Sequence, residues 1–151
     1  MKNIYIGCDH AGFVLKGTII GHLLSLGYEV FDAGTYSDES CDYPFYAKEV
    51  CKNVLRDENS LGILVCGTGI GMSLAANKFK GIRAAVCGDF FSAKYTRLHN
   101  DANALCMGGR VVGAGLALEM VDVFIDTEFE GGRHQRRIDQ IMAIQDGTFE
   151  E

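Results

Sequence analysis

Short apolar stretches alternate with longer amphipathic ones along the whole chain. Five stretches rich in β-branched and other apolar residues predict strands, at residues 3–8, 28–32, 62–66, 82–87 and 102–107. Each is followed by glycine or polar residues and then by a helical pattern, at residues 13–26, 44–56, 70–78, 90–98, 113–125 and 133–145. The sequence therefore predicts strand–helix alternation throughout.

The predicted strands are apolar on both faces, which is typical of a parallel sheet covered by helices on both sides. No linker, repeat or low-complexity tract divides residues 1–151, so we expect one domain. The predicted fold is α/β, a Rossmann-like three-layer α/β/α domain with a five-stranded parallel sheet in the flavodoxin-like order 2-1-3-4-5. That order brings the loops after the first and third strands together at the switch point, where such sheets bind ligands.

Charge and hydropathy narrow the range of partners. The formal net charge is −6, which would repel nucleic acid or an acidic membrane surface. The longest apolar stretch, near residues 116–125, is interrupted by Glu119 and Asp122 and is too short to span a bilayer. We therefore expect neither a nucleic-acid nor a membrane partner, and any anionic ligand must be held by local groups.

The six cysteines indicate a reducing compartment. The chain begins without the apolar stretch of a secretory signal, so we expect free thiols and a cytoplasmic location. No pair of cysteines has C-x-x-C spacing, and the four histidines do not complete a zinc pattern with them. No metal and no cofactor are predicted.

The segment CGTGIG at residues 66–71 is the first candidate for chemistry. It follows a predicted strand and opens a helix, so the backbone N–H groups of Gly67, Thr68, Gly69, Ile70 and Gly71 can bind an oxygen anion. The helix end would also favour the thiolate of Cys66, a candidate base. A plain tight turn beside a buried, inert cysteine is the alternative, because Cys is often buried and other cysteines also end strands.

Three further groups of polar residues could carry function. Asp9 and His10 follow the first strand at the switch point, where a ligand contact is expected. His99 ends a helix at the other edge of the sheet, where it could move protons or simply complement the helix dipole. Arg133 and Arg137 lie one turn apart at the start of a helix, a spacing suited to clamping a phosphate, although a solvated basic turn is possible.

The predicted helix at residues 113–125 is apolar around most of its circumference, whereas a surface helix usually has one apolar stripe. We expect it to pack on another subunit. A helix enclosed between sheet and neighbouring helix within one chain would have the same pattern.

Six motifs in order resemble the ribose-5-phosphate isomerase B family from end to end. They are GCDHAG (residues 7–12), DYP (42–44), CGTGIG (66–71), AANK (75–78), HND (99–101) and EGGRH (130–134). The resemblance implies an aldose–ketose isomerase of the pentose phosphate pathway, acting on a sugar phosphate without a metal or cofactor. It implies that Cys66 removes the C2 proton, that His99 assists opening of the furanose ring, and that Thr68 lies beside the enediolate charge.

The resemblance also implies the substrate contacts. Asp9 would contact the sugar hydroxyls, and the phosphate would be held by His10, Arg133 and Arg137, with help from Arg110. Asn100 and Tyr43 match further substrate-contacting positions. Some members carry a carboxylate base where this chain has Met72, so this sequence resembles the branch that uses a thiol.

Members of this family form homodimers or homotetramers whose active sites are lined by two subunits. The resemblance therefore implies that the segment from His99 to Arg110 faces the Cys66 of a neighbouring copy. The same family includes relatives that act on six-carbon sugar phosphates, and the sequence does not select between five and six carbons.

Two other classes compete with an isomerase. A nucleotide- or flavin-binding domain fits the α/β order, with Asp32 ending the second strand as a candidate ribose ligand, but GCDHAG lacks the required glycine spacing. A catalytically silent binding protein is the other alternative, although both Cys66 and His99 are present.

Overall fold

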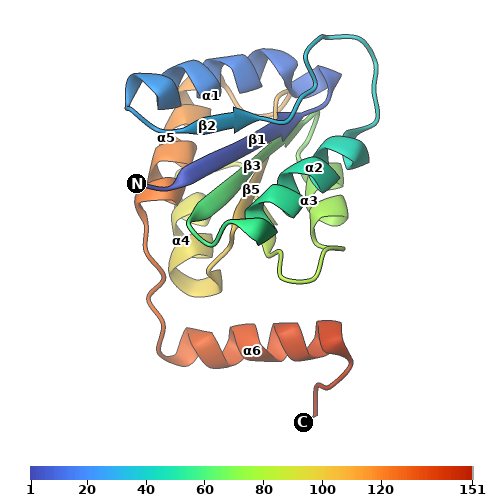
Figure 1. Ribbon diagram of the computed structural model, residues 1–151. Helices are drawn as coiled ribbons and strands as arrows, with labels where there is room; N and C mark the ends of the chain where they lie inside the picture. Colours follow the sequence, from blue (N-terminus) through green and yellow to red (C-terminus); the bar gives the residue numbers. More distant parts are fainter. Residues whose placement is uncertain (151) are drawn as a thin grey trace.

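The computed structural model describes residues 1–150, which form one parallel five-stranded sheet between two helical layers (Figure 1). The α/β prediction is thereby confirmed. The strands are β1 (Asn3–Cys8), β2 (Val30–Asp32), β3 (Ser60–Cys66), β4 (Ala84–Val86) and β5 (Ala104–Gly108). β2 and β4 are shorter than predicted because each pairs with one neighbour only, β2 with β1 and β4 with β5.

The two faces of the sheet are covered by different helices. One face packs against α1 (Phe13–Ser25), α4 (Phe90–Asn100) and α5 (Ala114–Asp126). The other packs against α2 (Tyr43–Arg56) and α3 (Ile70–Ala76). Alternate strand residues feed the two cores, so Ile63 and Val65 face one layer while Leu64 and Cys66 face the other.

The strand order is 2-1-3-5-4, so the predicted order was wrong in its last two strands. All five residues of β5 are buried, whereas β4 has three partly or fully exposed residues and lies at the edge. A strand as apolar as β5 buries more apolar surface when it pairs on both sides, between β3 and β4, than it would at the edge of the sheet. The predicted neighbourhood of β1 and β3 is confirmed, and β5 is added beside them.

The apolar helix α5 packs within its own chain, which is the second of the two arrangements that its sequence pattern left open. Ala117, Met120, Val121 and Phe124 are fully buried between the sheet and the neighbouring helices α1 and α4. Being enclosed on several sides explains why α5 is apolar around most of its circumference.

Helix α6 (Arg133–Asp146) is the element that stands apart from the two layers (Figure 1). It contacts α4, and a hollow of about 500 Å³ lies between it and the β4 side of the domain. Ile141 and Ile144 line this hollow and remain 48% and 64% exposed. Among residues 1–150, no helix combines the length and apolarity needed to cross a membrane.

Candidate active site

The loop after β3 holds Cys66 in a fixed position. Cys66 ends a strand in which every residue is buried, and the N–H of Gly69 donates to its Sγ at 3.1 Å. Gly69 has φ of +80°, and a β-carbon there would lie 2.7 Å from the carbonyl carbon of Met107. Only glycine fits this turn, and the turn aims a backbone N–H at the sulfur.

The same loop presents further donors and a hydroxyl. The N–H of Ile70 donates to Thr68 Oγ1 at 3.2 Å, which orients the Thr68 side chain at the loop tip. The N–H of Gly71 lies in the first turn of α3, where a helix supplies no acceptor of its own. The loop therefore has the donors that an oxygen anion requires.

The loop after β1 faces this one because β1 and β3 are neighbours. Asp9 is buried, and its Oδ1 accepts the N–H groups of Ala11 and Gly12 at 2.9 and 3.2 Å. The N–H of Cys41 donates to His10 Nδ1 at 3.2 Å. Nδ1 is thus an acceptor, so the ring carries its hydrogen on Nε2, which is the free donor of His10.

Seven of the predicted site residues meet in one cavity of about 440 Å³. It is lined by Asp9, Tyr43, Cys66, Gly67, Thr68, Ile70, Gly71 and Leu74. Tyr43 packs against Gly71 so closely that a β-carbon on Gly71 would lie 2.6 Å from its ring. The sequence analysis missed Leu74, although it lies one helical turn after Ile70 and so shares its face.

Arg110 follows β5 and lies beside the loop that carries Cys66. The backbone N–H of Arg110 donates to the Gly67 carbonyl at 3.1 Å, and the backbone N–H of Gly109 donates to the Cys66 carbonyl at 2.8 Å. A guanidinium nitrogen of Arg110 would lie 3.5 Å from a β-carbon on Gly67. Arg110 therefore accompanies the Cys66 of its own chain, and the implied grouping of Arg110 with His99 was wrong.

Five of the six cysteines, Cys66 among them, are buried. All six are free thiols. Burial raises the pKa of Cys8 and of Cys87 to about 11, that of Cys51 to about 12, and that of Cys106 well above its usual range. These four are neutral packing residues at neutral pH. Cys66 is the cysteine that lines the cavity, and its sulfur accepts the Gly69 N–H.

His99, Asn100, Arg133 and Arg137 form a second group at the opposite edge of the sheet. His99 lies in the last turn of α4, before β5 begins, whereas Cys66 pairs with Gly108 at the end of β5. The four strand steps between Ala104 and Gly108 alone span about 13 Å. Within one chain these residues do not reach the cavity.

The chain turns sharply after His99 and Asn100. Asp101 has φ of +44°, and its carboxylate accepts from Arg97 Nη1 at 2.9 Å and from Arg83 Nη2 at 3.1 Å. Arg83 Nε also donates to the Asn100 carbonyl at 3.0 Å. The two guanidinium groups therefore fix the turn that presents His99 and Asn100.

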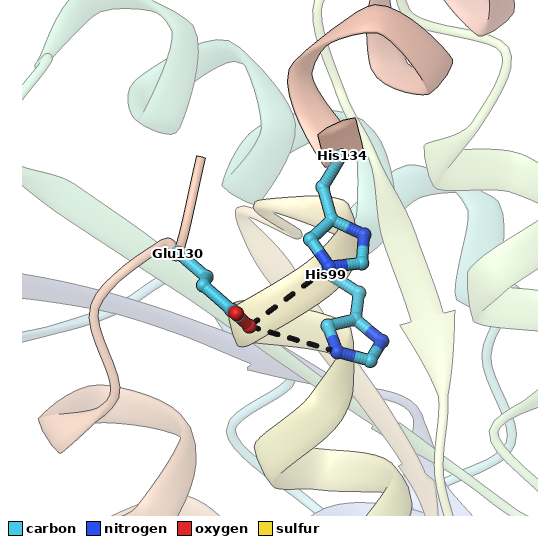
Figure 2. Close-up of side chains that lie close together, drawn as sticks. All are labelled: His99, Glu130 and His134. Atoms are coloured by element: carbon cyan, nitrogen blue, oxygen red, sulfur yellow. Dashed lines mark ion pairs between the residues drawn. The ribbon is translucent and has the colours of Figure 1, made fainter. Parts of the chain in front are cut away.

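His99 lies in a cluster with Glu130 and His134 (Figure 2). The two imidazole rings stack with centroids 4.0 Å apart and planes 13° apart. Glu130 Oε2 lies 3.8 Å from His99 Nε2 and 3.9 Å from His134 Nε2. Burial, the neighbouring His99 and the charge of Arg133 lower the pKa of His134, while Glu130 opposes the shift. Sequence reasoning gave neither Glu130 nor His134 a role.

These three side chains offer ligand atoms within 4.8 Å of one another, a spacing that could hold a metal ion. A metal binds imidazole through the lone pair in the ring plane. Because the rings lie face to face, a shared ion would leave the plane of at least one of them. The arrangement fits a stacked histidine pair better than a metal centre.

Asp32 does not serve as a nucleotide ligand here. Its Oδ1 lies 2.5 Å from Lys16 Nζ and accepts the N–H of Gly34 at 2.9 Å. Lys16 is fully buried and also donates to the Thr35 carbonyl. The carboxylate is thus engaged in anchoring the loop after β2, which disfavours the nucleotide-binding alternative.

The fold is an α/β domain whose cavity at the carboxyl ends of β1 and β3 is lined by a thiol and polar groups, an arrangement typical of an enzyme. Residues 4–141 match the ribose/galactose isomerase family. The chain is 53% identical over 145 residues to ribose-5-phosphate isomerase B of Escherichia coli (strain K12), covering 96% of this chain and 97% of that relative. This chain belongs to the ribose/galactose isomerase family.

Solved structures agree with this assignment. Ribose-5-phosphate isomerase B of Clostridium thermocellum has a TM-score of 0.94 at 50% identity, covering 97% of this chain and 99% of that one. The corresponding enzyme of Mycoplasma genitalium with bound ribulose 5-phosphate has a TM-score of 0.91 at 43% identity, covering 95% and 96%. The resemblance of the six motifs is confirmed.

Proposed function

We propose that this chain interconverts ribose 5-phosphate and ribulose 5-phosphate in the pentose phosphate pathway, with the Cys66 thiolate as base. Sugar-phosphate isomerisation is the activity of its family, and the Mycoplasma genitalium relative binds ribulose 5-phosphate. One observation in this chain carries the proposal. The Cys66 sulfur lines the cavity together with Asp9, Tyr43 and the loop at residues 67–71, and it accepts the Gly69 N–H.

The reaction moves protons within the sugar and needs no oxidant. The thiolate takes the proton from C2 of the open-chain aldose, and the electron pair forms a C1–C2 double bond with negative charge on O1. The Cys66 thiol then returns its proton to C1, while the O2 hydroxyl proton passes to O1 and a carbonyl forms at C2. The backbone N–H groups of the loop at residues 67–71 would stabilise the negative charge of the enediolate. In comparable sites each such donor contributes about 3–4 kcal/mol.

Ring opening precedes this step. In our proposal His99 donates a proton to the ring oxygen as the C1–O4 bond breaks, and the O1 hydroxyl loses its proton as the aldehyde forms. Asp9 contacts the sugar hydroxyls. The phosphate is held by Arg133, Arg137 and the Nε2–H of His10, with Arg110 beside the loop, while Asn100 and Tyr43 contact the sugar.

We further propose that two copies of the chain complete each site, in a homodimer or homotetramer. The support is distance: His99 lies beyond the far end of β5, more than about 13 Å from Cys66. Helix α6 stands apart from the two layers, and Ile141 and Ile144 stay exposed on it. A second copy packed against α6 would bury this face and bring His99 to the partner's Cys66.

Location and domain organisation complete the proposal. Six free thiols among the described residues suit the reducing conditions of the cytoplasm. The two layers share one sheet, which supports a single isomerase domain over residues 1–151.

The test is the turnover of ribose 5-phosphate by the purified protein, with ketose formation as the readout. We expect Cys66→Ser to lose turnover by about 10²–10⁴-fold, the range for removing a general base. Cys51→Ala is the matched control, because Cys51 is buried in the same core and its raised pKa makes it a packing residue. Full turnover by Cys66→Ser would refute the thiolate mechanism.

A further inference from the structure

We propose that His134 and Glu130 are positioning residues for His99: the His134 ring fixes the plane of the His99 ring, and Glu130 orients its Nε2. This inference rests on the proposed function, since His99 acts there as the ring-opening acid. It predicts that both residues matter for ribose 5-phosphate, which must open, and not for ribulose 5-phosphate, which has no furanose ring.

The His99 ring is held on two sides. His134 covers one face at 4.0 Å between ring centroids. Tyr95, one turn earlier on α4, meets the ring edge-on at 5.0 Å and 80°, and is itself stacked on Phe91 at 4.1 Å. His99 nevertheless remains 35% exposed, which leaves a side of the ring open to a substrate.

His134 is itself rigid. It is only 6% exposed and lies in the first turn of α6. Its backbone N–H donates to the Gly131 carbonyl at 3.2 Å. Its Nε2 is buried and has no hydrogen-bond partner among residues 1–150. The nitrogen lies within 3.9 Å of the carboxylate that also faces His99.

The surrounding charges leave the acid role to His99. The groups facing the pair are Glu130 from the loop, Arg133 and Arg137 from α6, and Tyr95 from α4. The pKa of His134 is lowered by burial, by His99 and by the two arginines, so His134 is neutral near pH 7. Glu130 is 53% exposed, and its carboxylate faces Nε2 of both rings. It faces both rings at distances longer than a hydrogen bond, 3.8 Å from His99 Nε2 and 3.9 Å from His134 Nε2.

The experiment compares two readouts on the same purified protein. The first is turnover of ribose 5-phosphate, with kcat and KM determined separately from pH 5.5 to 9. The second is deuterium incorporation at C1 of ribulose 5-phosphate in D2O, followed by NMR, which requires enediolate formation but no ring opening. The variants are His134→Leu, His134→Phe and Glu130→Gln, with Gln135→Ala as the control on the exposed side of α6.

We expect His134→Leu to lower kcat for ribose 5-phosphate by about 10- to 100-fold, the range for a misplaced catalytic group. Deuterium incorporation should stay within about twofold of the parent. His134→Phe retains a flat ring, so it should recover most of the turnover. Glu130→Gln should lower kcat for ribose 5-phosphate less than His134→Leu does and leave deuterium incorporation unchanged, because Glu130 is 53% exposed and lies 3.8 Å from His99 Nε2.

Two results would overturn the inference. One is full ribose 5-phosphate turnover by both His134→Leu and Glu130→Gln. The other is an equal loss in both readouts for His134→Phe and Glu130→Gln, which would indicate a structural role. Failure of the proposed function has a different signature, namely a parent protein without deuterium incorporation, or a Cys66→Ser variant that retains it.

Discussion

Gly69 is the position where the loop geometry is least tolerant, and replacing it by alanine tests the account of the site. Its φ of +80° costs an L-residue about 1–2 kcal/mol, and the new β-carbon would lie 2.7 Å from the backbone of Met107. Met107 belongs to the buried strand β5, which cannot move aside as a side chain can. Displacement adds about 1–3 kcal/mol, as in overpacked cores. We expect a total loss of about 3 kcal/mol, which lowers Tm by about 6–12 °C in a domain of this size.

The assay combines thermal unfolding with turnover of ribose 5-phosphate at 25 °C. Gly69→Ala should lower kcat/KM at least about tenfold, because the N–H that donates to Cys66 Sγ moves with the loop. Gly71→Ala is the control: it lies in α3, and its β-carbon meets only the ring of Tyr43, which is partly exposed. Alanine favours the helix, so Tm should hold or rise slightly while KM rises as Tyr43 shifts. A Gly69→Ala protein with the Tm and turnover of the parent would refute the reasoning.

Three further predictions address anchoring, pH and thiol reactivity. Lys16→Met leaves the Asp32 carboxylate without its partner, so the free energy of unfolding measured in urea should fall by about 2–3 kcal/mol. This loss is smaller than for a fully buried ion pair because Asp32 is partly exposed. The pKa of His134 is lowered in the folded state, so its contribution to stability is complete above about pH 6.5 and is lost as the pH falls through the lowered pKa. On acidification, Tm should therefore drop less in His134→Phe than in the parent. Alkylation by iodoacetamide at pH 8, located by mass spectrometry, should spare Cys51, whose pKa is raised to about 12. Ribose 5-phosphate should slow the alkylation of Cys66, which lines the cavity. An alkylation rate of Cys66 that does not change with substrate would contradict its place in the site.

The hydrophobic pattern predicted the elements well and their arrangement less well. Apolar runs revealed five strands, since burial on both faces removes polar residues from a parallel strand. Pairing between strands depends on contacts that no local pattern records, and for this reason β5 and β4 were placed in the wrong order. The uniform apolarity of α5 reflects enclosure within one chain. Exposed apolar side chains lie on several elements, among them Ile141 and Ile144 on the otherwise polar helix α6 and Phe91 on α4.

The site was predictable where residues adjacent in sequence act together. The loop at residues 66–71 and Asp9 follow neighbouring strands, so strand position alone brought them to one cavity. The cluster of His99, Glu130 and His134 joins residues that are about 30 positions apart, through the packing of α6 on α4. Chain spacing carries no signal for such a contact. The motif EGGRH contained both missed residues without indicating their partner.

The central claim is that one copy's Cys66 works with another copy's His99, and subunit complementation tests it most directly. Cys66→Ala and His99→Ala proteins, each inactive alone, are refolded together in equal amounts and assayed with ribose 5-phosphate. Random pairing makes half of the dimers mixed, and each mixed dimer has one site free of both substitutions. The account predicts recovery to about a quarter of parental turnover. A mixture that forms mixed dimers, as shown by differently tagged copies, yet stays inactive would contradict it.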